Sequence, residues 1–454
     1  MSGLHAAGND GELAASVERF GAGGGAGLLP PRLVEGGRIL GEVALRDVLA
    51  LPGGQIISVL RSGADVLVAP LVAGHDDVRR ALPGDGAFEG LLALIERGAP
   101  VGRFGFRRFA GPGAAEPATG PRGERAIDVD QSNESVVVGE HVVVKLYPIT
   151  APGPQPGLEL PEHLAEAGFE GVPTPIGAVT WLDDEGDEVL LATAAAFLPG
   201  ARDGWEWYLE LLLGWLDGDV DEDSAFGPAR EVGSLAGRLH AALATPTSVL
   251  PQPVQVVGPE MLESWRVRAE ATLDEALTLT GGPEGERLRA IADRVRASFD
   301  VFGHQAQARA MRIHGDLHVG QILHGEGGLA VTDFDGNPMA PVAERRALES
   351  PARDLASLVR SVDHLGRIAH RLREGRDADI DDWIARSVAD VTDAYRAELA
   401  GRGRADLFDG RLLRPFEVAQ EAHEFVYAAR FIPRWRYVPD LAIAAMFPHE
   451  REAF

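Results

Sequence analysis

The pattern of apolar residues changes partway along this 454-residue chain. Up to Pro199, short apolar runs predict one antiparallel sheet with strands at 135–138, 141–147, 176–181 and 188–198. After it, apolar residues recur every three or four positions, which is the spacing of an amphipathic helix. The pattern therefore predicts a β-rich part followed by an α-rich part.

The α-rich part is predicted to contain long helices interrupted by a few short strands. The helical periodicity covers 205–216, 228–244, 260–274, 284–300, 354–371, 380–400 and 415–432. Short strands are expected around 311–313, 321–324 and 329–333. Turns beside such strands are held by rigid backbone, so they are suitable positions for catalytic side chains.

A further module precedes the predicted sheet. Short β-like runs between Arg38 and Pro70 predict a small sheet, and a helix is expected near 86–97. The following segment, GPGAAEPATGPRG (111–123), is rich in glycine and proline and predicts an irregular linker. We therefore predict three domains, which are an N-terminal cap module at 1–110, a β-rich N-lobe at 111–200 and a mainly helical C-lobe at 201–454.

Composition narrows the functional classes. With 69 acidic and 43 basic residues the net charge is −26, which disfavours binding to nucleic acid or to an anionic membrane. The absence of cysteine excludes disulfides and thiolate metal sites. No signal peptide or membrane-spanning stretch is recognisable, so a cytoplasmic protein is expected, with no indication of its oligomeric state.

Lys145, in the apolar run VVVKLYP, is the only lysine of the chain. One interpretation is that a genome favouring arginine codons left a single lysine by chance. The other is that this position needs a compact point charge on a flexible stem, as in binding of nucleotide phosphates. The residues around Lys145 do not separate these two interpretations.

Two aspartate-bearing turns, IHGDLHVGQIL and LAVTDFDGNP, supply candidate chemistry. Phosphoryl transfer needs one aspartate to accept the proton of the attacking hydroxyl, a second to hold Mg²⁺, and often an amide oxygen that completes the metal shell. Asp316, Asp333 and Gln321 fit these three roles. The alternative is a pair of structural Asx-turns, which would not require His314 and Gln321 as well.

These turns resemble the catalytic and metal loops of the aminoglycoside-phosphotransferase-like, or protein-kinase-like, small-molecule kinases. Three further segments resemble the actinobacterial maltokinases: QSNESVVVGEHVVVKLYP (131–148), FLPGARDGWEW (197–207) and AERRALESPARDLASLVRS (343–361). Two segments, DFDGNP (333–338) and EFVYAARFIPRW (424–435), are more similar in sequence to the related glucosamine kinases. The resemblance extends from about Gln131 to the end of the chain.

The resemblance implies an α+β, bilobal protein-kinase-like fold with an extra N-terminal cap module. The implied activity is ATP- and Mg²⁺-dependent phosphorylation of a sugar hydroxyl, with glucosamine as the favoured acceptor and its 6-position as the expected site. Two alternatives change the acceptor, to maltose with maltose 1-phosphate as product, or to an aminoglycoside. A nucleotide-sensing pseudokinase is the non-enzymatic alternative.

The resemblance also implies roles for particular residues. Asp316 is the expected catalytic base, and the metal is expected at Gln321, Asp333 and Asp335. The residues expected to bind ATP are Ser132, Asn133, Ser135, Lys145, Glu159, Ala196 and Leu198. The residues expected to bind the sugar are Asp316, His318, Asp335, Glu421, Glu424, Tyr427, Arg430 and Trp435.

One expectation for the sugar pocket also has a physical argument. Glucosamine is cationic below the pKa of its amine, so its pocket should supply carboxylates, and Glu417, Glu421 and Glu424 share one face of a predicted helix. The alternative is a solvated acidic stripe.

Asp354 is expected to serve the fold, as the N-cap of a helix and as an anchor of the catalytic loop.

Overall fold

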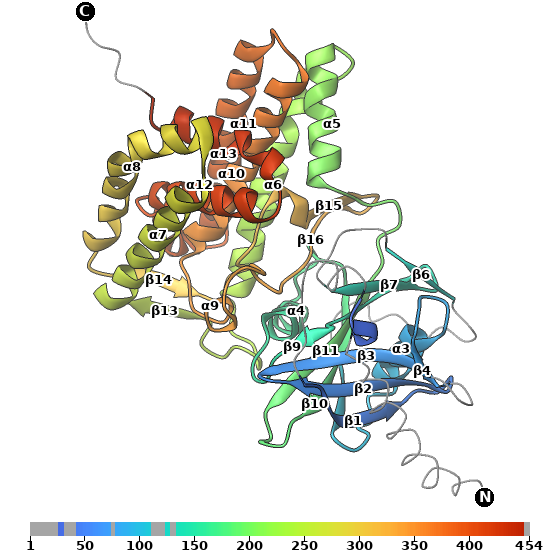
Figure 1. Cartoon of the computed structure of the whole chain (residues 1–454). Coiled ribbons are helices and arrows are strands. Elements are labelled where there is room, and N and C mark those ends of the chain that lie inside the picture. Colours follow the sequence, from blue (N-terminus) through green and yellow to red (C-terminus); the bar gives the residue numbers. More distant parts are fainter. Residues whose placement is uncertain (1–25, 31–41, 74–77, 110–122, 128–132, 449–454) are drawn as a thin grey trace, which may run out of the picture. The chain divides into compact units, whose positions relative to one another are not determined.

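The computed structural model describes residues 26–30, 42–73, 78–109, 123–127 and 133–448 (Figure 1). The chain separates into two compact units, Met1–Pro199 and Gly200–Phe454. The first is rich in strands and the second in helices, as the change of pattern at Pro199 predicts. Among the described helices, none combines the length and hydropathy needed to cross a bilayer.

The described part of the first unit contains two sheets (Figure 1). One has the order β1-β2-β3-β4 with β9 paired to β3, and the other has the order β5-β10-β11-β8-β7-β6. Their strands are β1 (Ala44–Ala50), β2 (Gln55–Ser62), β3 (Asp65–Ala73), β4 (Val78–Arg80), β5 (Phe104–Arg108), β6 (Glu124–Ala126), β7 (Glu134–Val138), β8 (Val142–Leu146), β9 (Ile149–Thr150), β10 (Pro175–Leu182) and β11 (Glu188–Ala196). All pairings are antiparallel, so the predicted four-strand antiparallel sheet is present, with β5 and β6 added at its two edges.

Helix α3 (Ala87–Arg97) packs against both sheets. Its buried residues Phe88, Leu91 and Ile95 belong to one hydrophobic cluster that also contains Ile57 of the first sheet and Val144 of the second. The helix ends where its C-cap, Gly98, adopts φ 65°, a conformation that glycine reaches without a Cβ clash. The residues predicted as cap module and N-lobe thus share a core, and their division into two domains stays a prediction.

The second unit is built from helices (Figure 1). Its elements are β12 (Arg202–Asp203), α5 (Gly204–Asp217), α6 (Glu222–Leu243), β13 (Val254–Val257), α7 (Pro259–Leu279), α8 (Gly282–Gly303), β14 (Ala308–Met311), β15 (Ile322–Gly325), β16 (Gly328–Val331), α9 (Val342–Arg345), α10 (Pro351–Leu372), α11 (Asp377–Gly401), α12 (Leu413–Arg430) and α13 (Tyr437–Met446). Each predicted helix is present, and α9 and α13 were not predicted. Helix α10 is buried along most of its length against α5, α11, α12 and α13.

Charged side chains are buried where α10 packs against α12. Less than a tenth of each residue is exposed in Arg360, Asp363, His364, Arg367, Glu417 and Glu421. His364 Nε2 lies 3.0 Å from Glu421 Oε1, and the Arg367 guanidinium donates to Asp363 at 2.9 Å. Three cations balance three carboxylates when His364 is protonated. Buried charges are tolerated in a protein interior when they are paired in this way.

This pairing predicts a pH-dependent contribution to stability. Burial acts to lower the pKa of His364, but the hydrogen bond to Glu421 and the negative charges of Glu421, Glu424 and Asp363 together outweigh it and raise this pKa. The stabilisation is therefore fully present below the unfolded pKa of about 6.5 and lost as pH rises through the folded pKa. We expect His364→Gln to lower Tm most at low pH, with a difference that shrinks as pH rises.

Thermal unfolding from about pH 5 to about pH 9 measures this difference. The matched control is His304→Gln, because His304 is an exposed histidine at the end of α8. A loss in His364→Gln that is constant with pH would contradict the proposed protonated pair.

Candidate active site

The turn that carries Asp316 lies between β14 and β15 and is anchored by Asp354. The backbone N–H groups of His314 and Gly315 donate to the two carboxylate oxygens of Asp354 at 2.8 and 2.9 Å. On the other side, His240 Nε2 lies 3.1 Å from the same carboxylate. Gly315 has φ 82°, which favours glycine at this bend. The Asp316 turn is therefore held by hydrogen bonds from its backbone to one buried carboxylate.

Asp354 is suited to this anchoring role because it stays ionised. Burial acts to raise its pKa, but the hydrogen bond with His240 and the nearby positive charge and backbone donor outweigh that effect and lower it. Asp354 was also predicted to be the N-cap of α10, and this prediction was wrong. The cap is Ser350, whose side chain accepts from the Ala352 N–H, which leaves Asp354 in the first turn, facing the catalytic loop.

The second aspartate-bearing turn is joined to the first through the β15–β16 hairpin. The Thr332 N–H donates to the Gln321 carbonyl at 2.9 Å, so the hairpin pairing continues beyond Ile322↔Val331. His314 Nε2 donates to the Thr332 carbonyl at 2.9 Å, and its ring lies 4.8 Å from that of Phe334. The segments carrying Asp316, Gln321 and Asp333 are thereby fixed next to one another.

Asp333 adopts φ 63°, in the left-handed region that residues with a side chain rarely occupy. Strained backbone of this kind concentrates at functional sites. Asp333, Asp335 and Gln321 offer oxygen donors only, which are the ligands that Mg²⁺ prefers. The residues present therefore fit a magnesium site.

Asp316 has the environment expected of a general base. Its side chain is 23% exposed, so it can reach a ligand while remaining partly shielded from water. Burial raises its pKa, a nearby Asp333 adds to this effect, and three histidines, at 314, 318 and 423, oppose it; the net shift is upward. A raised pKa makes a carboxylate a better proton acceptor near neutral pH.

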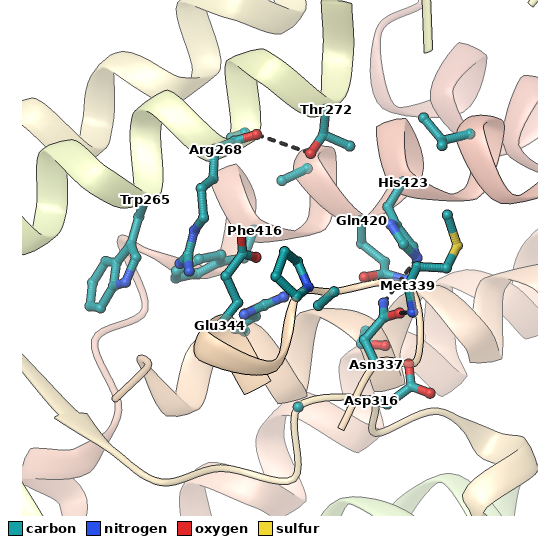
Figure 2. A pocket seen from close by; sticks show the side chains of 18 of the residues that line it. Trp265, Arg268, Thr272, Asp316, Asn337, Met339, Glu344, Phe416, Gln420 and His423 are labelled. Carbon is teal, nitrogen blue, oxygen red and sulfur yellow. Dashed lines mark hydrogen bonds between the residues drawn. The ribbon is translucent and has the colours of Figure 1, made fainter. Parts of the chain in front are cut away.

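A pocket of about 250 Å³ opens beside Asp316 within the second unit (Figure 2). It is formed by α7, α12, the segment around Asn337 and the start of α10. Asn337 Nδ2 donates to His423 Nε2 at 3.0 Å, and the Asn337 side-chain oxygen accepts from the Met339 N–H at 2.9 Å. Gln420, also on the pocket wall, donates to Glu424 at 3.0 Å. Polar groups thus surround the space next to the Asp316 carboxylate.

None of the three helix α12 glutamates lines this pocket. Glu421 has no exposed surface and pairs with His364 of α10, and Glu417 lies near Arg360. The expectation that Glu421 contacts the sugar is therefore not retained, because its carboxylate is committed to the helix interface. Glu424 is half-buried and accepts from Gln420, so it is the member of the set that lies close to the pocket wall.

The other predicted sugar-binding residues lie at the end of α12 and after it. Arg430 lines the pocket and is ion-paired with Glu275. The Tyr427 ring packs on Phe431, with centroids 5.3 Å apart. Trp435, in the short helix η4 (Pro433–Trp435), meets the ring of Trp205 edge-on at 5.8 Å.

Four residues at or beside the site were not predicted from the sequence: Trp205, Asn337, Gln420 and His423. Trp205 begins α5, and its ring lies 6.0 Å from that of His318. Trp205 lies in the segment FLPGARDGWEW and Asn337 in DFDGNP, so the resemblance of these two segments to known kinases could have indicated both residues. For Gln420 and His423 the sequence carries no such signal.

The predicted nucleotide-binding residues lie in the first unit. Lys145 on β8 is directly opposite Ser135 on β7 and Thr193 on β11, so the three share one face of the sheet. Glu159 is in the first turn of α4 (Pro156–Glu166), which packs on β10 and β11. Asn133 directly precedes β7, whereas Ser132 is outside the described residues.

The predicted hinge residues lie at the end of β11. Ala196 is its last residue and donates its N–H to the Thr174 carbonyl at 2.9 Å. The next residue, Phe197, donates its N–H to the His141 carbonyl at 2.7 Å.

A second group of side chains, between α10 and α12, has residue types that can bind a metal. Among the described residues, the side chains of Asp363, His364 and Glu421 lie close enough together for one metal ion to contact all three. Arg360 and Arg367 already lie beside these carboxylates, however, and their charge disfavours a further cation. The oxygen donors around Asp333 are the better match to a metal.

The two turns and the mixed α/β architecture define a class of protein. The family model described as the phosphotransferase enzyme family matches residues 124–389, and the chain belongs to this family. Two curated relatives are more specific. Glucosamine kinase from Streptacidiphilus jiangxiensis is 40% identical over 416 residues, which cover 90% of this chain and 92% of the relative. Glucosamine kinase from Mycolicibacterium smegmatis is 36% identical over 409 residues, which cover 88% and 97%.

Solved structures of glucosamine kinases are also similar to this chain. A glucosamine kinase crystal form has a TM-score of 0.80 and 38% identity, with 93% of this chain and 97% of that chain covered. A glucosamine kinase in complex with glucosamine, ADP and inorganic phosphate has a TM-score of 0.77 at 38% identity, covering 93% and 98%. The predicted family and the predicted α+β, protein-kinase-like fold are therefore confirmed.

Proposed function

We propose that this protein is an ATP-dependent glucosamine kinase. The observation that carries the proposal is the Asp316 turn, fixed beside the Asp333 turn and next to a polar pocket. It occurs in a chain that is 38% identical to a kinase solved with glucosamine, ADP and phosphate. The expected product is glucosamine 6-phosphate.

In the proposed reaction Asp316 accepts the proton of the sugar hydroxyl. The hydroxyl oxygen forms a bond to the γ-phosphorus of ATP, the bond to the β–γ bridging oxygen breaks, and ADP leaves. Asp333 and Gln321 would hold Mg²⁺, with Asp335 either completing a second metal position or contacting the sugar. When bound, the metal neutralises charge on the phosphates.

The acceptor is proposed to lie against the pocket wall near Asp316. Glu424, oriented by Gln420, is the carboxylate we assign to the cationic amine of the sugar. Tyr427 and Trp435 offer aromatic faces of the kind that stack on sugar rings. Arg430, held by Glu275 at the pocket, is assigned to a sugar hydroxyl or to the transferring phosphoryl group.

On the nucleotide side, Lys145 is proposed to bind the α- and β-phosphates, steadied by Glu159. Ser135 lies on the same face of the sheet as Lys145, and Asn133 directly precedes β7, the strand of Ser135. Both residues are assigned to the phosphates, together with Ser132. The backbone of Ala196 to Leu198 is assigned to adenine.

Lys145 supplies a direct prediction. Lys145→Met keeps the length and most of the volume of the side chain but removes its charge. A hydrogen bond to a charged group is worth about 1.5–3 kcal/mol, so we expect Mg-ATP to bind about 10- to 100-fold more weakly. Isothermal titration calorimetry measures this. Unchanged nucleotide affinity would argue that Lys145 is a chance survivor in a buried strand.

The proposed function is tested by coupled ADP release with Mg²⁺ and ATP against glucosamine, glucose, maltose and an aminoglycoside. Turnover that is fastest with glucosamine supports the proposal. Turnover with only maltose or the aminoglycoside keeps the mechanism and replaces the acceptor. Binding of Mg-ATP without turnover of any sugar would favour a nucleotide-sensing module.

A further inference from the structure

Tyr395 of α11 belongs to a buried network of hydrogen bonds that reaches the Asp316 turn. Its hydroxyl lies 2.7 Å from Nδ1 of His240, and His240 Nε2 lies 3.1 Å from Oδ2 of Asp354. The same carboxylate accepts two backbone N–H groups of the Asp316 turn. No more than 1% of Tyr395, His240 or Asp354 is exposed. The Tyr395–His240–Asp354 network therefore connects three helices, α11, α6 and α10, to this turn out of reach of water.

The direction of each hydrogen bond in this network can be assigned. Burial acts to raise the pKa of Asp354, but its hydrogen bonds and the nearby histidines outweigh this effect, so the carboxylate stays ionised and only accepts. His240 therefore donates from Nε2. Burial raises the pKa of Tyr395 well above its usual range, so its hydroxyl keeps the proton. Among the described residues, Nδ1 of His240 is the hydrogen-bond partner of this hydroxyl, and a buried O–H requires an acceptor, so Nδ1 carries a lone pair.

A close approach of α6 to α11 brings Tyr395 to His240. A Cβ placed on Gly237 would lie 3.0 Å from the Tyr395 carbonyl oxygen, and one on Gly233 would lie 2.2 Å from the Val391 carbonyl oxygen. The two glycines are four residues apart, so they lie on the same face of α6. The Tyr395 ring meets the His240 ring edge-on, with centroids 5.5 Å apart. The hydroxyl is thus held at a fixed position relative to the imidazole.

We propose that Tyr395 is a positioning residue for the phosphoryl transfer, acting on the Asp316 turn through His240 and Asp354. Its O–H holds His240 in the tautomer and ring orientation that direct Nε2–H at Asp354. Without the hydroxyl, the buried Nδ1 has no donor, and the imidazole can move its proton to Nδ1 or rotate. Asp354 then loses one donor, and the carboxylate that holds the turn is less firmly oriented. The inference rests on the proposed function, because it concerns the placement of the proposed base.

The first test is Tyr395→Phe in the full-length protein, which removes one oxygen atom and keeps the ring. We expect kcat with glucosamine and Mg-ATP to fall about tenfold, the change that corresponds to one hydrogen bond. KM for the sugar and Mg-ATP affinity should stay within about twofold of the native values, because the hydroxyl positions the base and touches neither substrate.

The matched control is Tyr208→Phe. Tyr208 is an equally buried tyrosine on α5 and lies outside the Tyr395–His240–Asp354 network. Loss of a buried hydroxyl should lower Tm in both variants, whereas kcat should fall only in Tyr395→Phe.

A double-mutant cycle with His240→Gln separates an effect through His240 from a general effect on packing. The glutamine amide can donate to Asp354 from near the position of Nε2 but has no acceptor at the position of Nδ1. In the His240→Gln background, Tyr395→Phe should therefore change kcat by less than about twofold. A tenfold loss in both backgrounds would contradict the inference.

Hydrogen exchange gives a readout that needs no turnover. The His314 and Gly315 N–H groups are hydrogen-bonded to Asp354 in the native protein. They should exchange with deuterium about tenfold faster in Tyr395→Phe than in the native protein or in Tyr208→Phe. Mass spectrometry of a peptide that contains both residues measures the difference.

The outcomes distinguish the inference from the function on which it rests. A native protein that phosphorylates no sugar overturns the proposed function, and hydrogen exchange then decides the inference alone. In an active protein, native kcat or native exchange in Tyr395→Phe overturns the inference and leaves the function standing. Equal losses of kcat in Tyr208→Phe and Tyr395→Phe would also overturn it, because the loss of any buried tyrosine hydroxyl would then disturb the site.

Discussion

Replacing Asp316 by asparagine is expected to lower kcat by about 1,000-fold or more, within the range that general-base catalysis contributes. The amide keeps the shape of the side chain but accepts no proton. Mg-ATP affinity should change little, because the base is assigned to the sugar hydroxyl and not to the nucleotide. Coupled ADP release at saturating glucosamine measures the first quantity and calorimetry the second.

The pH dependence gives an independent check on this role. Because burial raises the pKa of Asp316, turnover should fall as pH drops through a value above the usual one of about 3.9 for aspartate. The matched control is Asp406→Asn, an exposed aspartate of the same unit, which should retain native kinetics. Substantial turnover by Asp316→Asn would remove this residue from the chemistry.

The substitution Asp354→Asn is expected to lower both stability and turnover. The native carboxylate accepts from two backbone N–H groups and pairs with His240, all in a buried setting. An asparagine has one acceptor oxygen, so its NH₂ group must face a backbone donor at 314 or 315. Leaving a buried donor unsatisfied costs about 1–3 kcal/mol, and we expect the free energy of unfolding to fall by about 2–4 kcal/mol.

Turnover should fall about 100-fold with this loss of stability, because the backbone of the Asp316 turn is no longer fixed. Ser350→Ala is the matched comparison, since Ser350 caps the same helix and its loss costs about 1 kcal/mol. That variant should keep a nearly native kcat. Asp354→Asn with native kcat would mean that the carboxylate supports only the packing of α10.

The order of elements was predictable from local pattern. Strands β7, β8, β10 and β11 and the long helices of the second unit have apolar spacings that belong to one kind of element only. Helix α13 was not predicted because it is short and follows directly on η4. It also contains few polar residues, so no alternation of polar and apolar positions marks its buried face. Strand β14 (Ala308–Met311) begins and ends earlier than the strand predicted around 311–313.

The helix α12 glutamates show where spacing stops being informative. Glu417, Glu421 and Glu424 do share one side of the helix, as predicted from their positions. Which side of α12 faces the pocket depends on its neighbours, and Arg360 and His364 of α10 draw Glu417 and Glu421 inward. A charged partner on another helix thus reverses the expected role of a carboxylate.

The sequence by itself predicted the chemistry of the proposed catalytic centre, because Asp316, Gln321 and Asp333 lie within one short segment, 313–338, whose turns and hairpin are set by local interactions. Only the tertiary structure decided which distant side chains reach that centre. Trp205, His423 and the anchoring orientation of Asp354 depend on how α5, α12 and α10 pack. Spacing along a helix fixes the angles between side chains about its own axis, whereas long-range packing sets the rotation and position of that axis.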